Sequence, residues 1–367
     1  MTEHGAGSPG RWKIIFSIYI KDLIDAVRNW ATLTVIIGTA MVLLTAQAGS
    51  LLANLVDEDI VLAYASGHST LLRTMRRLEK PRVVPVDSLD EMEMAVGDAP
   101  EARIGVIIPP EAELDLEAGN PVQLNVVRAH WAEIGEVNSL IEQLDQGLSA
   151  ETPSEIEFTI LPELAYPQPE GGGRSLMVTS ALVIGVLSIG TFLTPYLLAE
   201  EREEGTLSVL MLSPASGAQI TFAKALVGLT YCLIVGFVAL LFNLHFIVHP
   251  WVSSLAIFML GFFAVCLGLL IGLLAEQIST VNLWMAVALL ILILPTIVLF
   301  MDSSSLPAWV GTLLDWIPTV AAGRLLRLSF AEAISARILL QPISALAVFA
   351  IGSFSAVVYK LRQEDRV

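Results

Sequence analysis

Long apolar runs alternate with short polar segments along most of the chain, and one long polar stretch interrupts this pattern after the first run. A helix needs about 20 mostly apolar residues to cross the hydrocarbon core of a bilayer. Six runs reach that length, at residues 31–53, 175–199, 220–246, 252–274, 283–301 and 339–360. The pattern therefore predicts an α-helical polytopic membrane protein with six transmembrane helices.

The long polar stretch, residues 54–174, is patterned as short strands and helices. Strand-like runs lie at residues 61–65, 82–86, 103–109, 123–127 and 156–161. Helix-like segments separate them: one begins at Ser69, another covers residues 88–96, and residues 132–148 repeat apolar positions at helical spacing. Strands that alternate with helices predict an α/β domain, inserted here between the first and second transmembrane helices.

Basic residues beside the predicted helices indicate which side of the membrane each loop lies on, because cytoplasmic loops carry an excess of lysine and arginine. One side has nine: Arg11, Lys13, Lys21, Arg28, Arg202, Lys224, Lys360, Arg362 and Arg366. Short loops on the other side have three: Arg324, Arg327 and Arg337. We therefore expect a multi-pass protein of a prokaryotic cytoplasmic membrane, with both termini in the cytoplasm and an extracytoplasmic domain at residues 54–174.

Three further segments complete the expected layout. Residues 1–30 predict a cytoplasmic amphipathic helix in the membrane interface, because apolar residues lie broadly on one helical side. These residues are Ile14, Ile15, Ile18, Leu23 and Val27. Residues 302–338 form an outer loop, which we hypothesise re-enters the membrane as short helices around residues 309–316 and 321–328. Residues 361–367 form a cytoplasmic tail.

Charge and motif content exclude several kinds of function. Between residues 56 and 174 there are 23 acidic and eight basic residues, so most of the net charge of −16 lies there. Nucleic acid is not an expected partner, since phosphate binding needs clustered cations. That domain contains no HExxH and no GxSxG motif, and the chain has no GxxxxGK[ST] loop. We therefore expect no enzymatic activity, no catalytic residue and no nucleotide or other cofactor bound by this chain.

The apolar runs offer few groups for chemistry. Cys232 and Cys266 lie inside them, which is typical of packing residues. His245 and His249 are four residues apart but have no third metal ligand in view, so no metal site is expected. No charged residue lies in the middle of a predicted span, and ion-coupled transporters usually need one. If the protein moves a substrate, the energy is expected to come from another subunit.

The most informative polar segment lies between the second and third predicted helices, at residues 200–219. It begins with a charged cluster: Glu200, Glu201, Arg202, Glu203 and Glu204. Anions at the C-terminal end of a helix cost about 0.3–1 kcal/mol each, and moving one into lipid costs about 2.5–3.5 kcal/mol. The cluster must therefore face water, and cations should meet it; Arg202, Lys224 and a partner protein are the candidates.

Residues after this cluster predict a helix break followed by a very short helix. Gly205 can end the second helix, and Thr206 can cap a new one. The new helix has an apolar edge and a Ser-Pro stop: Leu207, Leu210, Met211, Ser213 and Pro214. Ser216 and Gln219 then form a capping box for the third helix. A helix this short is marginal by itself, so a groove in a partner is expected to hold it.

This segment resembles the coupling loop of ABC-2 type exporter permeases, in the branch with a large outer domain that includes sodium- and drug-extruding permeases. That family has the pattern E-R-x-x-G-T-x-x-x-L-x-x-[ST]-P before a lysine, matched here from Glu201 to Pro214 and at Lys224. The resemblance implies a pair of permeases, identical or homologous, that binds two copies of an ABC ATPase subunit. ATP and magnesium would bind to the ATPase, and residues 200–219 would contact it.

Other functions stay open. The acidic outer domain could bind a partner, with the helices as an anchor; the protein would then be a membrane-anchored receptor or assembly factor. An ion-coupled carrier is a third class, and residues 200–219 could be an ordinary acidic turn. The leading prediction is the transmembrane permease subunit of an ATP-driven ABC exporter.

Overall fold

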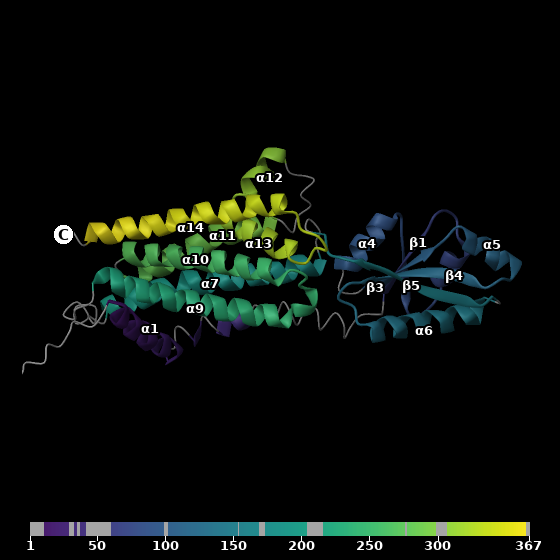
Figure 1. The fold of residues 1–367 in the computed structure, drawn as a ribbon, viewed down its shortest axis with the longest axis horizontal. Helices are drawn as coiled ribbons and strands as arrows, with labels where there is room; N and C mark the ends of the chain where they lie inside the picture. Colours follow the sequence, from purple (N-terminus) through teal and green to yellow (C-terminus); the bar gives the residue numbers. More distant parts are fainter. Residues whose placement is uncertain are drawn as a thin grey trace, which may run out of the picture.

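A long helical bundle carries an α/β unit at one end (Figure 1). The computed structural model describes residues 11–28, 33–34, 37–41, 60–98, 102–152, 154–168, 173–203, 216–275, 277–298 and 307–364. We call the end of the bundle next to the α/β unit the sheet end, and the opposite end the far end.

The α/β unit is built on a five-stranded mixed sheet with the order β2-β1-β3-β4-β5. Its strands are β1 (Ile60–Ala65), β2 (Arg82–Val86), β3 (Ala102–Ile108), β4 (Val122–Ala129) and β5 (Ile156–Ala165). β1 pairs in parallel with β2 and β3, β4 pairs in parallel with β5, and β3 and β4 are antiparallel. Each strand overlaps a run that the sequence pattern indicated.

Four helices accompany this sheet: α3 (Thr70–Met75), α4 (Leu89–Asp98), α5 (Glu111–Ala118) and α6 (Ile134–Glu151). The Ser69 side chain caps α3 by accepting a 3.0 Å hydrogen bond from the backbone N–H of Leu72. Sequence analysis did not predict α5. Its sequence, EAELDLEA, alternates charged and apolar residues, so its apolar positions do not recur at helical spacing.

Five described helices are long and apolar enough to cross a membrane. They are α7 (Gly173–Glu203), α9 (Gly217–Phe242), α10 (Pro250–Leu274), α11 (Ile278–Val298) and α14 (Ala336–Glu364). Most of the span predicted at residues 31–53 lies outside the described residues. Polytopic helical architecture is therefore established, and the sixth helix stays a prediction.

Two helices begin or end at other residues than the predicted spans. The span expected at 220–246 ends at Phe242, where the Asn243 side chain donates a 2.8 Å hydrogen bond to Ala239 O and a short 3₁₀ helix, η1 (Leu244–Phe246), follows. The span expected at 283–301 begins earlier, at Ile278. Hydropathy missed this first turn because polar side chains such as Ser279 and Asn282 lower the local average without breaking the helix.

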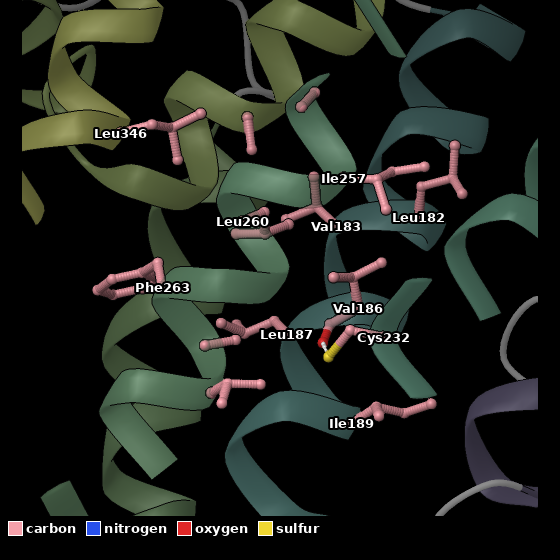
Figure 2. Close-up of a cluster of buried hydrophobic side chains, with 14 of the residues drawn as sticks. Leu182, Val183, Val186, Leu187, Ile189, Cys232, Ile257, Leu260, Phe263 and Leu346 are labelled. Carbon is pink, nitrogen blue, oxygen red and sulfur yellow. Dashed lines mark hydrogen bonds between the residues drawn. The ribbon is translucent and has the colours of Figure 1, made fainter. Parts of the chain in front are cut away.

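α7 is the most buried of the five long helices. Figure 2 shows apolar side chains of α7, such as Val186, packed among residues of α9, α10 and α14, which include Cys232 of α9 and Leu260 of α10. Contacts with α10 are especially close. A Cβ atom at Gly268 would lie 2.5 Å from Gly190 O, and one at Gly272 would lie 2.9 Å from Pro195 Cα. Small residues at these positions let the two backbones approach, as in other membrane helix pairs.

Segment 302–338, expected as an outer loop, contains two helices in its described part: α12 (Ala308–Leu314) and α13 (Pro318–Leu328). Residues 302–306 lie outside the described residues. α13 is almost wholly buried, and it packs against α7, α10, α11 and α14. Arg324 at the edge of α13 forms a 2.7 Å ion pair with Asp315. α13 is therefore a packed part of the bundle at its sheet end, whereas α12 is largely exposed, with Trp309 67% and Leu313 61% exposed.

An aromatic joint connects the α/β unit to the sheet end. The joint consists of Gly97, Asp98, His130, Trp131, Tyr166, Ser175, Phe246 and Phe330. The Trp131 ring stacks on Phe246 with centroids 5.6 Å apart, and its indole N–H donates a 3.3 Å hydrogen bond to Gly97 O. His130 stacks on Tyr166 at 4.9 Å, with its Nε2 3.2 Å from Phe246 O. Packing and hydrogen bonds together fix where the α/β unit lies.

Candidate coupling site at the far end of the bundle

At the far end, α7 ends and α9 begins, and the predicted coupling segment at residues 200–219 joins them. Glu200, Glu201, Arg202 and Glu203 lie in the last turn of α7. The other residues predicted in this loop lie outside the described residues: Glu204, Gly205, Thr206, Leu207, Leu210, Met211, Ser213 and Pro214. The short coupling helix therefore stays a prediction, and the structure gives its two attachment points.

A capping box begins α9, as the sequence predicted. Ser216 Oγ accepts a 3.4 Å hydrogen bond from the Gln219 N–H, and Gln219 Oε1 accepts a 2.9 Å bond from the Ser216 N–H. Such reciprocal bonds satisfy backbone donors that the first helical turn leaves free. They fix the point at which the coupling segment enters α9.

Lys224, two turns into α9, forms a buried ion pair with a residue that sequence analysis did not connect to it. Its Nζ lies 3.2 Å from Oδ2 of Asp22, and the two side chains are only 1% and 5% exposed. Asp22 belongs to α1 (Arg11–Arg28), the helix predicted in the interface. A charge in a low-dielectric interior is stable only when it is paired and hydrogen-bonded. The pair therefore ties α1 to α9.

Two more hydrogen bonds hold α1 along α9. The Tyr19 and Thr230 hydroxyl oxygens are 3.0 Å apart, and the Tyr231 hydroxyl donates a 2.8 Å bond to Leu23 O. Together with the ion pair, these contacts occupy about two turns of α9, from Lys224 to Tyr231. We call this set of contacts the α1 clamp: Tyr19, Asp22, Leu23, Lys224, Thr230 and Tyr231.

The opposite side of α1 presents a second apolar row. Trp12, Phe16, Ile20 and Ile24 recur every four residues and are 37–74% exposed. Sequence analysis chose a different set, and of these Ile14, Ile15, Ile18 and Leu23 are half-buried. The sequence alone does not tell which apolar row of α1 is buried. The position of α9 decides this, because α9 covers one side of α1 and leaves the other exposed. An exposed apolar row on an amphipathic helix is typical of a membrane surface.

Close packing links the coupling segment to the rest of the bundle. A Cβ atom at Gly228 of α9 would lie 2.5 Å from Thr194 Oγ1 of α7, and one at Gly190 of α7 would lie 2.5 Å from Ala264 Cβ of α10. There is no free space across either contact, and protein interiors are not continuously deformable. These contacts connect α7 directly to both α9 and α10.

The other candidate groups have structural surroundings. Cys232 and Cys266 are free and buried, and Cys232 Sγ donates to Val186 O at 3.6 Å (Figure 2), in agreement with a packing role. His249 Nε2 lies 3.2 Å from Glu332 O, and the His245 ring packs on Phe246. Among the described residues, no group of three His, Cys, Asp or Glu could hold a metal ion.

Comparisons with known proteins point to one family. Residues 30–359 match the family model described as ABC-2 family transporter protein. The inner membrane transport permease YhhJ of Escherichia coli (strain K12) is 25% identical over 297 residues, which cover 75% of this chain and 78% of that protein. The protein of the same name from Shigella flexneri gives the same values. The family match takes in the α/β unit, α7, the coupling segment and every later helix.

Proposed function

The chain belongs to the ABC-2 transporter family, and from this premise we propose that it is the transmembrane permease subunit of an ATP-driven exporter. Membrane subunits of this family are normally not catalytic themselves. ATP and magnesium bind to a separate ABC ATPase subunit in this proposal. The ATPase contacts residues 200–219 from the cytoplasm, and the permease converts that contact into helix movement.

One observation carries the proposal: the glutamate-rich segment is attached directly to α7, the most buried of the long helices. α7 packs against α9, α10, α11 and α13. A partner that moves residues 200–219 therefore acts on the centre of the bundle rather than on a peripheral helix.

The proposed topology follows the charge distribution. Six helices cross the membrane, including residues 31–53, and both termini and the far end are cytoplasmic. The α/β unit is then extracytoplasmic, and α13 lies as a re-entrant helix at the outer face. The exposed apolar row of α1 supports this orientation, since it places an interfacial helix beside α9 at the far end.

We further propose that two permeases, identical or homologous, pair to form the translocation path and bind two ATPases. α11 supports this arrangement, because it is the least buried of the long helices within one copy. Its exposed side chains include Leu283, Trp284, Leu290, Ile291 and Leu294. The sodium- and drug-extruding branch is the proposed subfamily, on the basis of the E-R-x-x-G-T pattern and the α/β unit.

The coupling proposal is tested by charge reversal at the far end. The variant Glu201→Lys/Glu203→Lys, or Leu210→Asp in the short helix, should lose co-purification of the ATPase that wild type captures from membranes. ATP-driven transport in vesicles should fall with it, while membrane insertion stays normal. The matched control is Glu142→Lys/Glu155→Lys, which makes the same charge change at exposed positions of the α/β unit. Full ATPase capture and transport by the far-end variants would refute the proposal.

A further inference from the structure

A cavity of about 430 Å³ lies between the far halves of α9, α10 and α14. Its walls come from all three helices and include Ala225, Leu229, Phe262, Leu269, Phe354 and Val357. α9 and α14 each pack against α10, so the cavity separates two helices that share a neighbour. Its size falls within the range of about 300–1,000 Å³ that small-molecule sites occupy.

Almost all of the lining is apolar. The rings of Phe262 and Phe354, from α10 and α14, lie 5.9 Å apart on one wall. A buried water molecule needs two to four polar partners, and these walls offer too few to hold a chain of waters. In a bilayer, the medium that meets such walls is hydrocarbon.

One end of the cavity is different, because it carries Arg362. This arginine lies in the last turn of α14, is exposed, and forms no ion pair with a carboxylate of the described residues. A single basic residue at the mouth of an apolar recess between transmembrane helices attracts an anionic lipid head group with about 1 kcal/mol. Lys224 of α9 does not line the cavity and pairs with Asp22 instead.

The length of the cavity matches one half of a membrane. Phe354 and Arg362 are eight residues apart on α14, which is about 12 Å at 1.5 Å per residue. Half of the hydrocarbon core of a bilayer is about 15 Å thick. An acyl chain that enters at Arg362 would therefore run through most of one leaflet along these walls.

We propose that this cavity binds one acyl chain of an anionic phospholipid, with the phosphate at Arg362. The bound chain fills the space between α9 and α14 and supports the first turns of α9, where Ala218 and Thr221 also line the cavity. The binding itself goes beyond the permease function and does not depend on it. Only the leaflet, the cytoplasmic one, rests on the orientation proposed above.

The test uses the purified full-length protein in nanodiscs that contain a phosphatidylglycerol with a photoreactive acyl chain. After illumination, mass spectrometry should locate the label on peptides from residues 218–229, 262–269 and 354–362. Ala225→Trp, which fills the cavity, should abolish labelling there. Ala218→Trp narrows the mouth at an exposed position and should lower labelling even if Ala225→Trp fails to fold. The matched control is Leu241→Trp, at a 63% exposed position near the sheet end of α9, which should label these peptides as wild type does.

A second arm tests the head group. Phosphatidylglycerol should label these peptides about fivefold more than a phosphatidylcholine with the same chain. Arg362→Gln should remove the difference, and Arg337→Gln, at the other end of α14, should not. Equal labelling of wild type by the two lipids would overturn the proposal. It would also be overturned if both tryptophan variants were labelled as strongly as wild type. Absence of label on wild type would show that protein fills the cavity and would also overturn it. No ATPase is present, so failure of the coupling experiment would leave this result unchanged.

Discussion

The two ends of the bundle are fastened by contacts of opposite kinds. At the sheet end, the joint relies on aromatic stacking and backbone acceptors: Trp131 on Phe246, His130 on Tyr166, and the Trp131 indole on Gly97 O. At the far end, the α1 clamp relies on a buried ion pair between Asp22 and Lys224. Loss of one apolar or aromatic contact removes only part of the stability of the joint, whereas an ion pair that loses one member leaves an uncompensated charge.

This difference suggests how each end responds to perturbation. The joint holds a whole folded unit through several contacts, most of them between neutral groups, so no one of them decides whether the unit stays in place. The clamp holds a single helix to α9 beside the proposed ATPase site. Its strongest contact is the Asp22–Lys224 ion pair, and loss of either member of that pair lowers stability strongly. We therefore expect the far end to be the more sensitive of the two to single substitutions.

The largest expected effect is the loss of one member of the ion pair. Asp22→Leu or Lys224→Met should lower stability by about 3–5 kcal/mol, because each removes the 3.2 Å contact between two buried charges. After Lys224→Met, the Asp22 carboxylate keeps only Lys21, which lies 3.8 Å away and is 60% exposed. The double variant Asp22→Leu/Lys224→Met should recover most of this loss, since two apolar side chains can replace a buried pair. Thermal unfolding of the purified protein in detergent measures all three. Additive losses in the double variant would show that the two residues are not coupled.

A smaller effect is expected at the joint. Trp131→Ala should cost about 2 kcal/mol, below the 3–5 kcal/mol of a fully buried tryptophan, because Trp131 is only half-buried. Hydrogen exchange of the His130 amide, which donates to Ala165 O at 3.0 Å, reports on the joint directly and should become faster. Trp309→Ala, at a 67% exposed position on α12, is the control and should leave that amide unchanged. If Trp131→Ala destabilised the protein more than Lys224→Met, the comparison between the two ends would be wrong.

Local patterns predicted what is local in the structure. Spans of α7 and α10 follow from hydropathy within a few residues, and the Ser216–Gln219 capping box follows from two residues three positions apart. α5 was missed because its sequence lacks helical periodicity. The helix break and short helix expected between Glu204 and Pro214 stay a prediction, based on the motif and on the energetic cost of clustered glutamates.

Contacts between distant parts of the chain could not be predicted. Asp22 and Lys224 are 202 residues apart, and in the sequence Asp22 looks like one of several exposed charges on an amphipathic helix. His130 and Phe246 are 116 residues apart, and nothing in either local sequence marks a joint. Both ends of the bundle depend on such pairs, because a helix pattern specifies which face is apolar but not which helix will cover it.

The smallest expected effect, a pH dependence, sharpens the comparison because two titrating groups of the joint, Asp98 and His130, are shifted mainly by burial. Burial raises the pKa of Asp98 above its ordinary 3.8, although the Ser175 side chain and N–H, the latter 3.3 Å away, and nearby Arg327 act to lower it. Burial lowers the pKa of His130 below 6.5. The Asp98 contribution to stability is complete below pH 3.8 and is lost as pH rises through its raised pKa. The His130 contribution is complete above pH 6.5 and is lost as pH falls through its lowered pKa.

These opposite signs can be separated with two variants. Asp98→Asn should remove the loss of joint stability on the alkaline side of pH 3.8, because asparagine keeps an acceptor for the Ser175 N–H and carries no charge to desolvate. His130→Gln should remove the loss below pH 6.5. Exchange of amides at the end of β4, followed from pH 4 to pH 8, measures both. A pH profile that neither variant changes would mean that these groups titrate alike in the folded and unfolded chain, and the joint would then differ from the clamp only in its aromatic contacts.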